Sequence, residues 1–206
     1  MLELLTGLGL SASAGLNAWV PLLVVGLLAR YTELLRLPES WQWLDNGWVL
    51  SILAVLLVVE LVADKVPVLD SVNDMLQTVV RPTSGGLVFA AGSSAETAAV
   101  SDPDALFADR GWLPVVIGVL VALVVHALKS AARPVVNAAT AGVGGPVVST
   151  AEDLTSVAMS VVAIVLPILI IVFLVGLVGL GWWAIRRRRA RRVRRPAGLP
   201  VPGPGR

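Results

Sequence analysis

Residues 112–128 read WLPVVIGVLVALVVHAL and decide the class of this protein, because the run contains a single ionisable side chain, His126. Such a helix is typical of a membrane span, which needs about 20 mostly apolar residues to cross about 30 Å of hydrocarbon. Of the 206 residues in the chain, 56% are hydrophobic and 15% charged, and the mean hydropathy is +0.84. A soluble domain of this size could not bury so much apolar surface, so we expect much of it to face lipid.

Three further apolar stretches predict further spans. They cover Leu8–Ala29, Trp48–Ala63 and Leu154–Ile185. The first is rich in small residues, which allow close helix packing in lipid, and Pro21 predicts a kink in it. Pro167 predicts a kink in the last. The predicted fold is therefore an all-α, polytopic transmembrane helix bundle with four spans.

Weaker segments separate these stretches. Residues 66–81 carry apolar side chains with the period of a helix, which predicts an interfacial amphipathic helix that begins at Pro67 and is ended by Pro82. Its polar face carries Asp70, Asp74, Gln77 and Arg81. Residues 85–100 are rich in Gly, Ala and Ser and predict one or two partial or re-entrant elements. Residues 134–146 contain two prolines and three glycines, which should forbid one long helix there.

The C-terminal tail carries the strongest charge signal in the chain. Residues 1–185 contain seven Lys or Arg against all fourteen acids, whereas residues 186–206 contain nine Arg and no acid. Eight of these arginines lie between Arg186 and Arg195, directly after the last predicted span, so the positive-inside rule predicts a cytoplasmic C-terminus in the cell membrane. We therefore predict a membrane domain over 1–185 and a disordered tail over 186–206. Contact with anionic lipid head groups is a simpler role for this tail than nucleic-acid binding.

The number of membrane crossings determines on which side of the membrane the N-terminus lies. Four spans place it on the cytoplasmic side together with the tail, whereas an additional crossing at 85–100 would place it outside. The sequence leaves this alternative open, together with the oligomeric state, for which a homo-oligomer is one option.

Ionisable residues inside apolar stretches form the candidate site. Glu60 and Asp64 are four residues apart on one helical face, and His126, Lys129 and Arg133 share a face of another helix if that helix persists. Charged side chains cost about 2.5 to 3.5 kcal/mol at the centre of a span, so we expect them to point inward. The complete candidate set is Glu60, Asp64, Lys65, Asp70, Asp74, Arg81, His126, Lys129, Arg133 and Asn137.

These residues allow two interpretations. The carboxylates could bind a cation or proton, or the basic residues an anionic group, which would make the cluster a polar pathway. Alternatively the charges only fix how the helices dock. Glu152 and Asp153 are interpreted separately, as acids in the first turn of the last helix, where they complement its dipole.

Two segments of the sequence resemble each other. VVELVADKVPVLDSVND begins at Val58 and VVHALKSAARPVVNAAT at Val124, and each leaves an apolar run through an ionisable residue, passes a lysine and reaches Pro-Val. Internal repeats of this kind are common in transporters. The alignment of the two segments needs a one-residue gap, so chance similarity is the alternative to an internal repeat.

Enzyme signatures are missing from the sequence. The chain has one His, no Cys, no HExxH, no GxSxG elbow and no GxxxxGK[ST] loop. We therefore expect no enzyme, no cofactor and no metal site. The preferred hypothesis is a transporter or channel for a small solute or ion, with a structural or assembly protein as the first alternative. A membrane enzyme that acts on a lipid head group is the second.

Four stretches carry a resemblance to a known family. They are GLSASAGLNAWVPLLVVGLLARY, ELVADKVPVLDSVNDMLQTVVRPTSGGL, HALKSAARPVVN and STAED. With these, residues 7–169 resemble an uncharacterised bacterial membrane family, domain of unknown function 4126. The resemblance implies a membrane protein and brings no activity with it. It directs attention to the ionisable residues named above.

Overall fold

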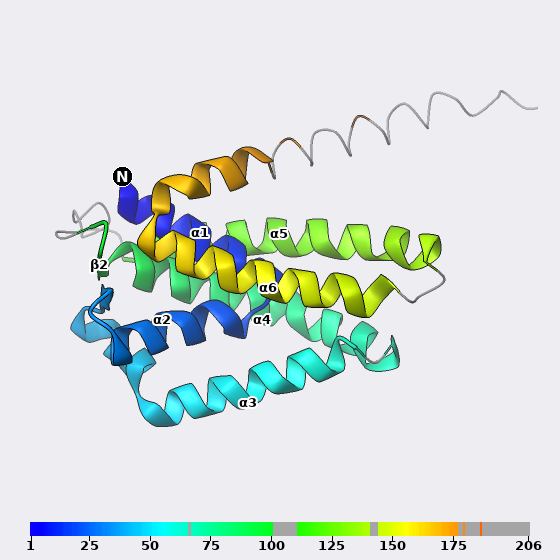
Figure 1. Cartoon of the computed structure of the whole chain (residues 1–206), viewed down its shortest axis with the longest axis horizontal. Coiled ribbons are helices and arrows are strands. Elements are labelled where there is room, and N and C mark those ends of the chain that lie inside the picture. The colour runs from blue at the N-terminus through cyan, green and yellow to red at the C-terminus, as the bar shows by residue number, and fades with distance from the viewer. Residues whose placement is uncertain (66, 101–110, 141–143, 177–178, 180–185, 187–206) are drawn as a thin grey trace, which may run out of the picture. The chain divides into compact units, whose positions relative to one another are not determined.

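The computed structural model describes residues 1–65, 67–100, 111–140, 144–176, 179 and 186. The described part is all-α, and Met1–Ile171 form one compact unit. Its principal helices, labelled in Figure 1, are α1 (Leu2–Leu16), α2 (Trp19–Tyr31), α3 (Gly47–Ala63), α4 (Pro67–Ser93), α5 (Trp112–Ala139) and α6 (Gly144–Val165). The shorter elements are β1 (Leu35–Arg36), β2 (Glu96–Thr97) and the 3-10 helices Glu39–Asp45 and Pro167–Leu169.

Two described helices are long and apolar enough to cross a membrane, namely Trp112–Pro134 within α5 and the whole of α6. A third span results if the 3-10 helix Glu39–Asp45 and α3, bent by 58°, count as one. The predicted span at 112–128 thus lies within α5. Of the predicted span at 154–185, α6 covers only 154–165, and it begins ten residues earlier than predicted. Residues 177–178 and 180–185 of that prediction lie outside the described residues. Apolar helices of this length are typical of a membrane protein, but the four predicted spans are not all present as such.

The predicted single span over 8–29 is wrong, because the chain reverses between α1 and α2 (Figure 1). The first half of α1 lies against the C-terminal end of α4, where Gly92 is next to the side chains of Thr6 and Leu10. The end of α2 returns to the same place, since β1 follows α2, β2 follows α4, and Leu35 pairs with Thr97. Residues 2–31 are therefore a helical hairpin. A re-entrant element was predicted, but at 85–100.

The reversal is made by Asn17 and not by Pro21. The side-chain oxygen of Asn17 accepts hydrogen bonds from the backbone N–H groups of Trp19 (3.1 Å) and Val20 (3.2 Å), which caps the start of α2. Asn17 itself has an extended backbone and ends α1. Pro21 lies in the first turn of α2, where the missing N–H costs nothing, so the predicted kink there is absent.

Helix α4 begins at Pro67 as predicted but continues through Pro82 to Ser93. At 27 residues it is about 40 Å long at 1.5 Å per residue. Its second half is held against α5 by close backbone packing, since a Cβ on Gly85 would lie 2.8 Å from the carbonyl oxygen of Gly118. This packing overrides the local cost of the proline. Residues 67–81 are thus no separate interfacial helix, because they form one helix with 82–93 and because Arg81 and Gln77 are 0% and 3% exposed.

Helix α5 likewise continues through Pro134, as far as Ala139. The glycine-rich segment then separates it from α6, so the predicted interruption lies after the proline. The interruption predicted at Pro167 is confirmed, because α6 ends at Val165 and a 3-10 turn begins at Pro167.

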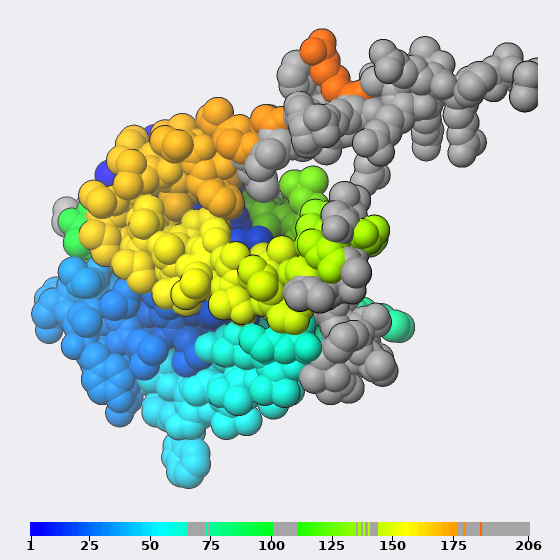
Figure 2. Space-filling view, turned by 45° about the vertical axis from the view of Figure 1, so that its right-hand side comes forward, coloured from blue at the N-terminus to red at the C-terminus, as the bar shows by residue number. Residues whose placement is uncertain are grey.

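Helix α1 lies at the centre of the bundle, between α4, α5 and α6. Small residues allow this, since a Cβ on Gly9 would lie 2.7 Å from the Cβ of Ala163 and one on Gly15 would lie 2.7 Å from the carbonyl oxygen of Ala122. On the face shown in Figure 2, dark blue atoms of the hairpin appear between the yellow of α6 and the cyan of α3.

A second unit comprises Val172–Arg206. Of its residues, 172–176, 179 and 186 are described, and Arg186 is exposed. The arginines from 187 to 195, with the predicted lipid contacts and disorder of the tail, lie outside the described residues.

Candidate functional site

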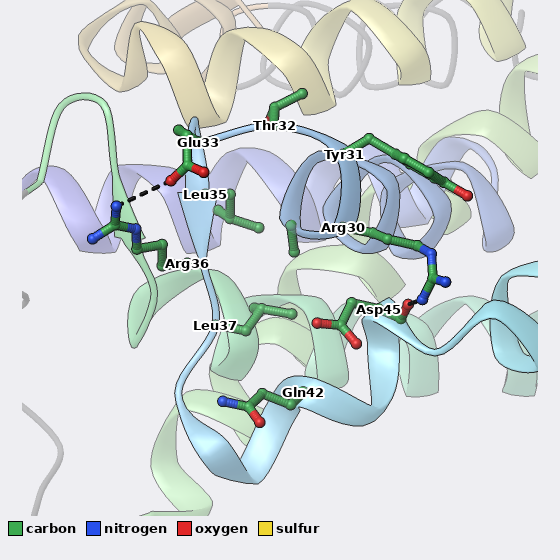
Figure 3. A pocket seen from close by; sticks show the side chains of 10 residues that line it. Arg30, Tyr31, Thr32, Glu33, Leu35, Arg36, Leu37, Gln42 and Asp45 are labelled. Atoms are coloured by element: carbon green, nitrogen blue, oxygen red, sulfur yellow. Dashed lines mark hydrogen bonds and ion pairs between the residues drawn. The ribbon is translucent and has the colours of Figure 1, made fainter.

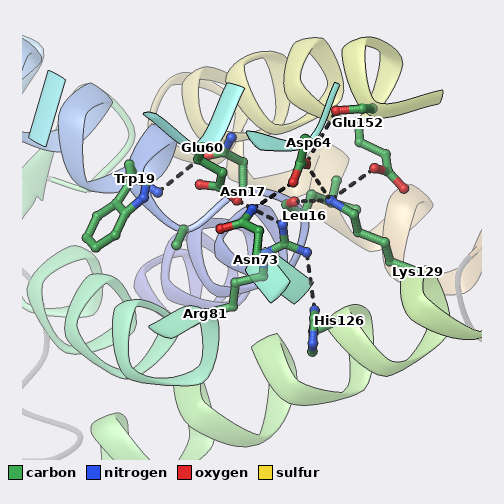
Figure 4. A network of polar contacts seen from close by, with 12 residues as sticks. Leu16, Asn17, Trp19, Glu60, Asp64, Asn73, Arg81, His126, Lys129 and Glu152 are labelled. Carbon is green, nitrogen blue, oxygen red and sulfur yellow. Dashed lines mark hydrogen bonds and ion pairs between the residues drawn. The ribbon is translucent and has the colours of Figure 1, made fainter. Parts of the chain in front are cut away.

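Charged side chains from α3, α4, α5 and α6 meet at the tip of the α1–α2 hairpin (Figure 4). The most deeply buried are Arg81 at 0%, Glu60 at 2%, His126 at 4%, and Asp64 and Lys129 at 5% exposure. We call this group the charge cluster. Its charged and polar members are Asn17, Glu60, Asp64, Asn73, Arg81, His126, Lys129, Arg133, Ser149, Glu152 and Asp153.

Arg81 connects α3 to α5 on one side of the cluster. Its Nη2 donates to Oε1 of Glu60 at 2.8 Å, and its Nη1 lies 3.2 Å from Nδ1 of His126. The other ring nitrogen of His126, Nε2, lies 3.2 Å from the hydroxyl oxygen of Thr78, one turn before Arg81 on α4. Charge-assisted bonds of this kind are about twice as strong as neutral ones.

Lys129 connects α5 to the hairpin and to α6. Its Nζ donates to the carbonyl oxygen of Leu16 at 2.8 Å and forms an ion pair with Oε2 of Glu152 at 2.9 Å. Leu16 is the last residue of α1, so the ammonium group lies at the negative end of that helix dipole. An ion pair with Asp64, at 3.9 Å, completes its surroundings.

Asp64 is the most heavily coordinated carboxylate. Its Oδ1 accepts a hydrogen bond from Asn73 at 2.7 Å, and its Oδ2 accepts from Arg133 at 3.2 Å and from Ser149 at 3.3 Å. Arg133 also reaches Oε2 of Glu152 at 3.4 Å. Asp64 is available for these contacts because α3 ends there and the chain turns into α4.

Asn17 joins the hairpin tip to α6. While its oxygen caps α2, its amide nitrogen donates to Oδ1 of Asp153 at 2.9 Å. The polar interface continues along α1 and α6, where the hydroxyl oxygen of Ser13 lies 2.7 Å from those of both Ser156 and Ser160. Buried and partly buried polar contacts thus stabilise the interruption between α1 and α2.

The described side chains of the cluster carry more negative than positive charge. The carboxylates are Glu60, Asp64, Glu152 and Asp153, and the cations are Arg81, Lys129 and Arg133. Four carboxylates against three cations leave a formal charge of −1 when His126 is neutral. In a low-dielectric interior such an excess favours the uptake of a proton or another cation.

Within the described part of the chain, four buried side-chain atoms have no hydrogen-bond partner. They are Oε2 of Glu60, Oε1 of Gln77, Nε of Arg81 and Oδ2 of Asp153. Three of the four are acceptors, and two of these belong to carboxylates. Leaving a buried polar group unpaired costs about 1 to 3 kcal/mol, and more when it is charged. These unpaired acceptor atoms therefore suit a cation or a ligand that donates hydrogen bonds.

The structure brings together six of the ten predicted site residues, namely Glu60, Asp64, Arg81, His126, Lys129 and Arg133. Lys65 is not among them, because it is exposed and donates to the carbonyl oxygen of Leu61 in the last turn of the preceding helix, α3. Asp70 and Asp74 lie in α4 and Asn137 in α5, but their side chains lie outside the described part of the structure.

Five residues of the cluster were missed as site residues, namely Asn17, Asn73, Ser149, Glu152 and Asp153. The prediction that Glu152 and Asp153 complement a helix N-terminus is wrong, since α6 begins at Gly144 and both acids lie well inside it. Acids inside a helix that also carries Ser149, Ser156 and Ser160 at helical spacing were the available signal. Asn17 offered a weaker signal, as a polar residue among small ones.

The two similar segments do not share a local structure. The first is interrupted between α3 and α4, whereas the second lies within the continuous helix α5. Both deliver an ionisable residue to the cluster, Glu60 from one and His126 from the other. The similarity therefore extends to the site, while the backbone differs.

No group of three or more His, Asp or Glu side chains converges as metal ligands among the described residues. In comparisons with known proteins, the family described as Domain of unknown function (DUF4126) matches residues 4–187. Neither a curated protein nor a solved structure matches the chain.

Proposed function

This chain belongs to the DUF4126 family, and we propose that it is a polytopic protein of the cell membrane that transports a proton or small cation, alone or with a solute, through the charge cluster. The observation that carries the proposal is the α1–α2 hairpin, whose interrupted tip lies inside the bundle against that cluster.

An interruption of a helix at membrane depth leaves backbone N–H and C=O groups without partners, which is unfavourable in free energy. Non-helical backbone at membrane depth is tolerated where it is buried in protein or lines a cavity, and transporters use such interruptions to form ion sites. Here the last carbonyl of α1 faces Lys129, and the Asn17 side chain bridges α2 to Asp153. A break with these contacts favours ion handling over simple packing.

The chemistry of the cluster favours a cation over an anion as the transported species. Lys129 and Arg133 are bonded to Asp64 and Glu152, which leaves the basic residues engaged by carboxylates. The carboxylates of Glu60 and Asp153 each keep one unpaired oxygen. The basic residues are therefore not available to bind an anion, whereas the unpaired carboxylate oxygens could bind a proton or a cation.

The proposal includes the topology that the sequence predicts, with a cytoplasmic C-terminus. The arginines from Arg186 to Arg195 would keep the C-terminus cytoplasmic and contact anionic lipid head groups there.

A structural protein without a substrate is the second candidate. It is favoured by the number of direct contacts that Asp64, Lys129 and Arg133 make with other helices, which would fix the docking of α3, α5 and α6 without any ligand.

Flux measurements with a matched pair of variants separate the two candidates. Glu60→Gln keeps an acceptor for Arg81 and removes the excess negative charge, so the protein should stay folded in liposomes while proton or cation flux falls at least tenfold. Glu39→Gln removes an exposed carboxylate from the 3-10 helix and should leave flux unchanged.

Flux in wild-type liposomes that equals the protein-free leak for protons, Na⁺ and K⁺ would overturn the transport proposal and favour the structural one. Equal flux in wild type and Glu60→Gln would show that the charge cluster is not the pathway.

A further inference from the structure

The segment between α2 and α3 forms a second polar feature, independent of the charge cluster. It is held in place by Leu35 and Leu44, which are 1% and 0% exposed, and by the pairing of β1 with β2. Aromatic side chains are exposed in this segment and at the helix ends that flank it, with Tyr31, Trp43 and Trp48 exposed by 71%, 44% and 82%. Exposed Trp and Tyr next to apolar helices are typical of the level at which lipid head groups meet water.

Two hollows open beside this segment. The larger, of about 610 Å³, is lined by the end of α2, by β1 and by the 3-10 helix (Figure 3). The smaller, of about 430 Å³, is lined by Asn46, Gly47, Trp48 and Ser51 at the start of α3. Arg30 lines both hollows and so lies at the boundary between them. Volumes of about 300 to 1,000 Å³ are usual for sites that hold a small molecule or head group.

Arg30 is fixed in position without a carboxylate. Its Nη1 donates to the backbone carbonyl of Asp45 at 2.8 Å, and its guanidinium lies 5.6 Å from the ring centre of Tyr31. Among the described contacts it forms no ion pair, in contrast to Arg81 and Arg133. A held guanidinium that is not paired with a carboxylate is well suited to bind a phosphate.

The other charged residues that line the larger hollow are Glu33, Arg36 and Asp45. Arg36 forms an ion pair with Glu33 at 3.0 Å, and the hydrogen bond that Arg36 donates to Glu33 raises the pKa of Arg36. The side chain of Asp45 points into the hollow in Figure 3 and makes no ion pair within the described residues. Arg30 and Asp45 together therefore present one positive and one negative charge.

We propose that these hollows bind a zwitterionic phospholipid of the phosphatidylethanolamine type, with its phosphate on Arg30 and its ammonium group against Asp45. The smaller hollow leads onto the outer face of α3, where Ile52 and Val55 are 57% and 63% exposed and offer an apolar path for the acyl chains. An anionic lipid has no ammonium for Asp45 and binds less well.

The test uses the full chain in detergent, depleted of lipid and titrated with phosphatidylethanolamine, phosphatidylglycerol or phosphatidylcholine while bound lipid is counted by native mass spectrometry. Wild type should bind phosphatidylethanolamine most tightly. Arg30→Gln should weaken this binding about tenfold, the usual effect of losing a charge-assisted bond. Arg36→Gln removes the same charge from the same hollow and should change binding less than about twofold. Asp45→Asn should abolish the preference for phosphatidylethanolamine over phosphatidylglycerol.

Equal losses in Arg30→Gln and Arg36→Gln, or no loss in Arg30→Gln, would overturn the proposal. Free phosphoethanolamine serves as the soluble probe. If it bound to wild type as tightly as phosphatidylethanolamine does, the acyl chains would contribute nothing to binding, the ligand would be a soluble phosphate ester and the lipid assignment would fall.

Discussion

Nη1 of Arg81 lies 3.2 Å from Nδ1 of His126, and this contact indicates which ring nitrogen carries the proton of the neutral histidine. A guanidinium has donors and no acceptor, so Nδ1 must carry a lone pair. The proton of the neutral ring then lies on Nε2, where it is donated to the hydroxyl oxygen of Thr78 at 3.2 Å. An imidazolium at this place would put a second cation against Arg81.

The first prediction concerns this tautomer. Because His126 is the only histidine in the chain, selective ¹⁵N-histidine labelling reports on it alone. At pH 7.5 the spectrum should show an unprotonated Nδ1 and a protonated Nε2. An Nδ1–H tautomer, or an imidazolium at that pH, would contradict the arrangement around Arg81.

The second prediction follows from the excess negative charge of the cluster. Arg81→Gln raises the excess from one to two and leaves the buried carboxylate of Glu60 without its cation. Removing one partner of a buried pair costs about 3 to 5 kcal/mol, so the thermal midpoint in detergent should fall steeply. Glu60→Gln, which brings the excess to zero, should lower the midpoint much less. Equal midpoints for the two variants would refute this account of the charges.

The third prediction tests the hairpin. The chain contains no cysteine, so single cysteines can be introduced and labelled with a membrane-impermeable thiol reagent. Leu2→Cys and Thr32→Cys flank the hairpin and should react from the same side of the membrane. A single span over 8–29 would make them react from opposite sides.

The fourth prediction concerns the contact between α4 and α5. A methyl group on Gly85 would collide with the Cβ of Ala122 and lie 2.8 Å from the carbonyl oxygen of Gly118, so Gly85→Ala must push the helices apart. Overpacking of this kind costs about 1 to 3 kcal/mol. We expect a lower thermal midpoint and a smaller yield of folded protein. Gly111→Ala, where a Cβ would meet nothing within 4 Å, is the matched control and should match wild type.

Local pattern was sufficient for much of the structure. The apolar run at 112–128, the helix over 47–63 and the interruption at Pro167 all followed from composition and proline, because a span must satisfy its own backbone and a proline cannot donate. Six of the ten predicted site residues could be found for a related reason, since an ionisable group in an apolar helix must turn toward a partner.

The reversal at Asn17, by contrast, was decided by tertiary structure. A run of about 22 mostly apolar residues satisfies the length of a span whether it crosses or folds back. Tertiary contacts, among them those of Asn17 with Asp153 and of Leu16 with Lys129, select the hairpin. These partners lie more than 100 positions away in the sequence.

Tertiary contacts also decided where the prolines could be tolerated. Pro82 and Pro134 look like helix ends in the sequence, yet α4 and α5 continue through both. What the chain by itself determined was which residues avoid water and which charges must be paired. Which charge pairs with which, and where a helix stops, depended on the close approach of α4 to α5 and on the interrupted hairpin, because packing energies between distant segments exceed the local cost of one proline.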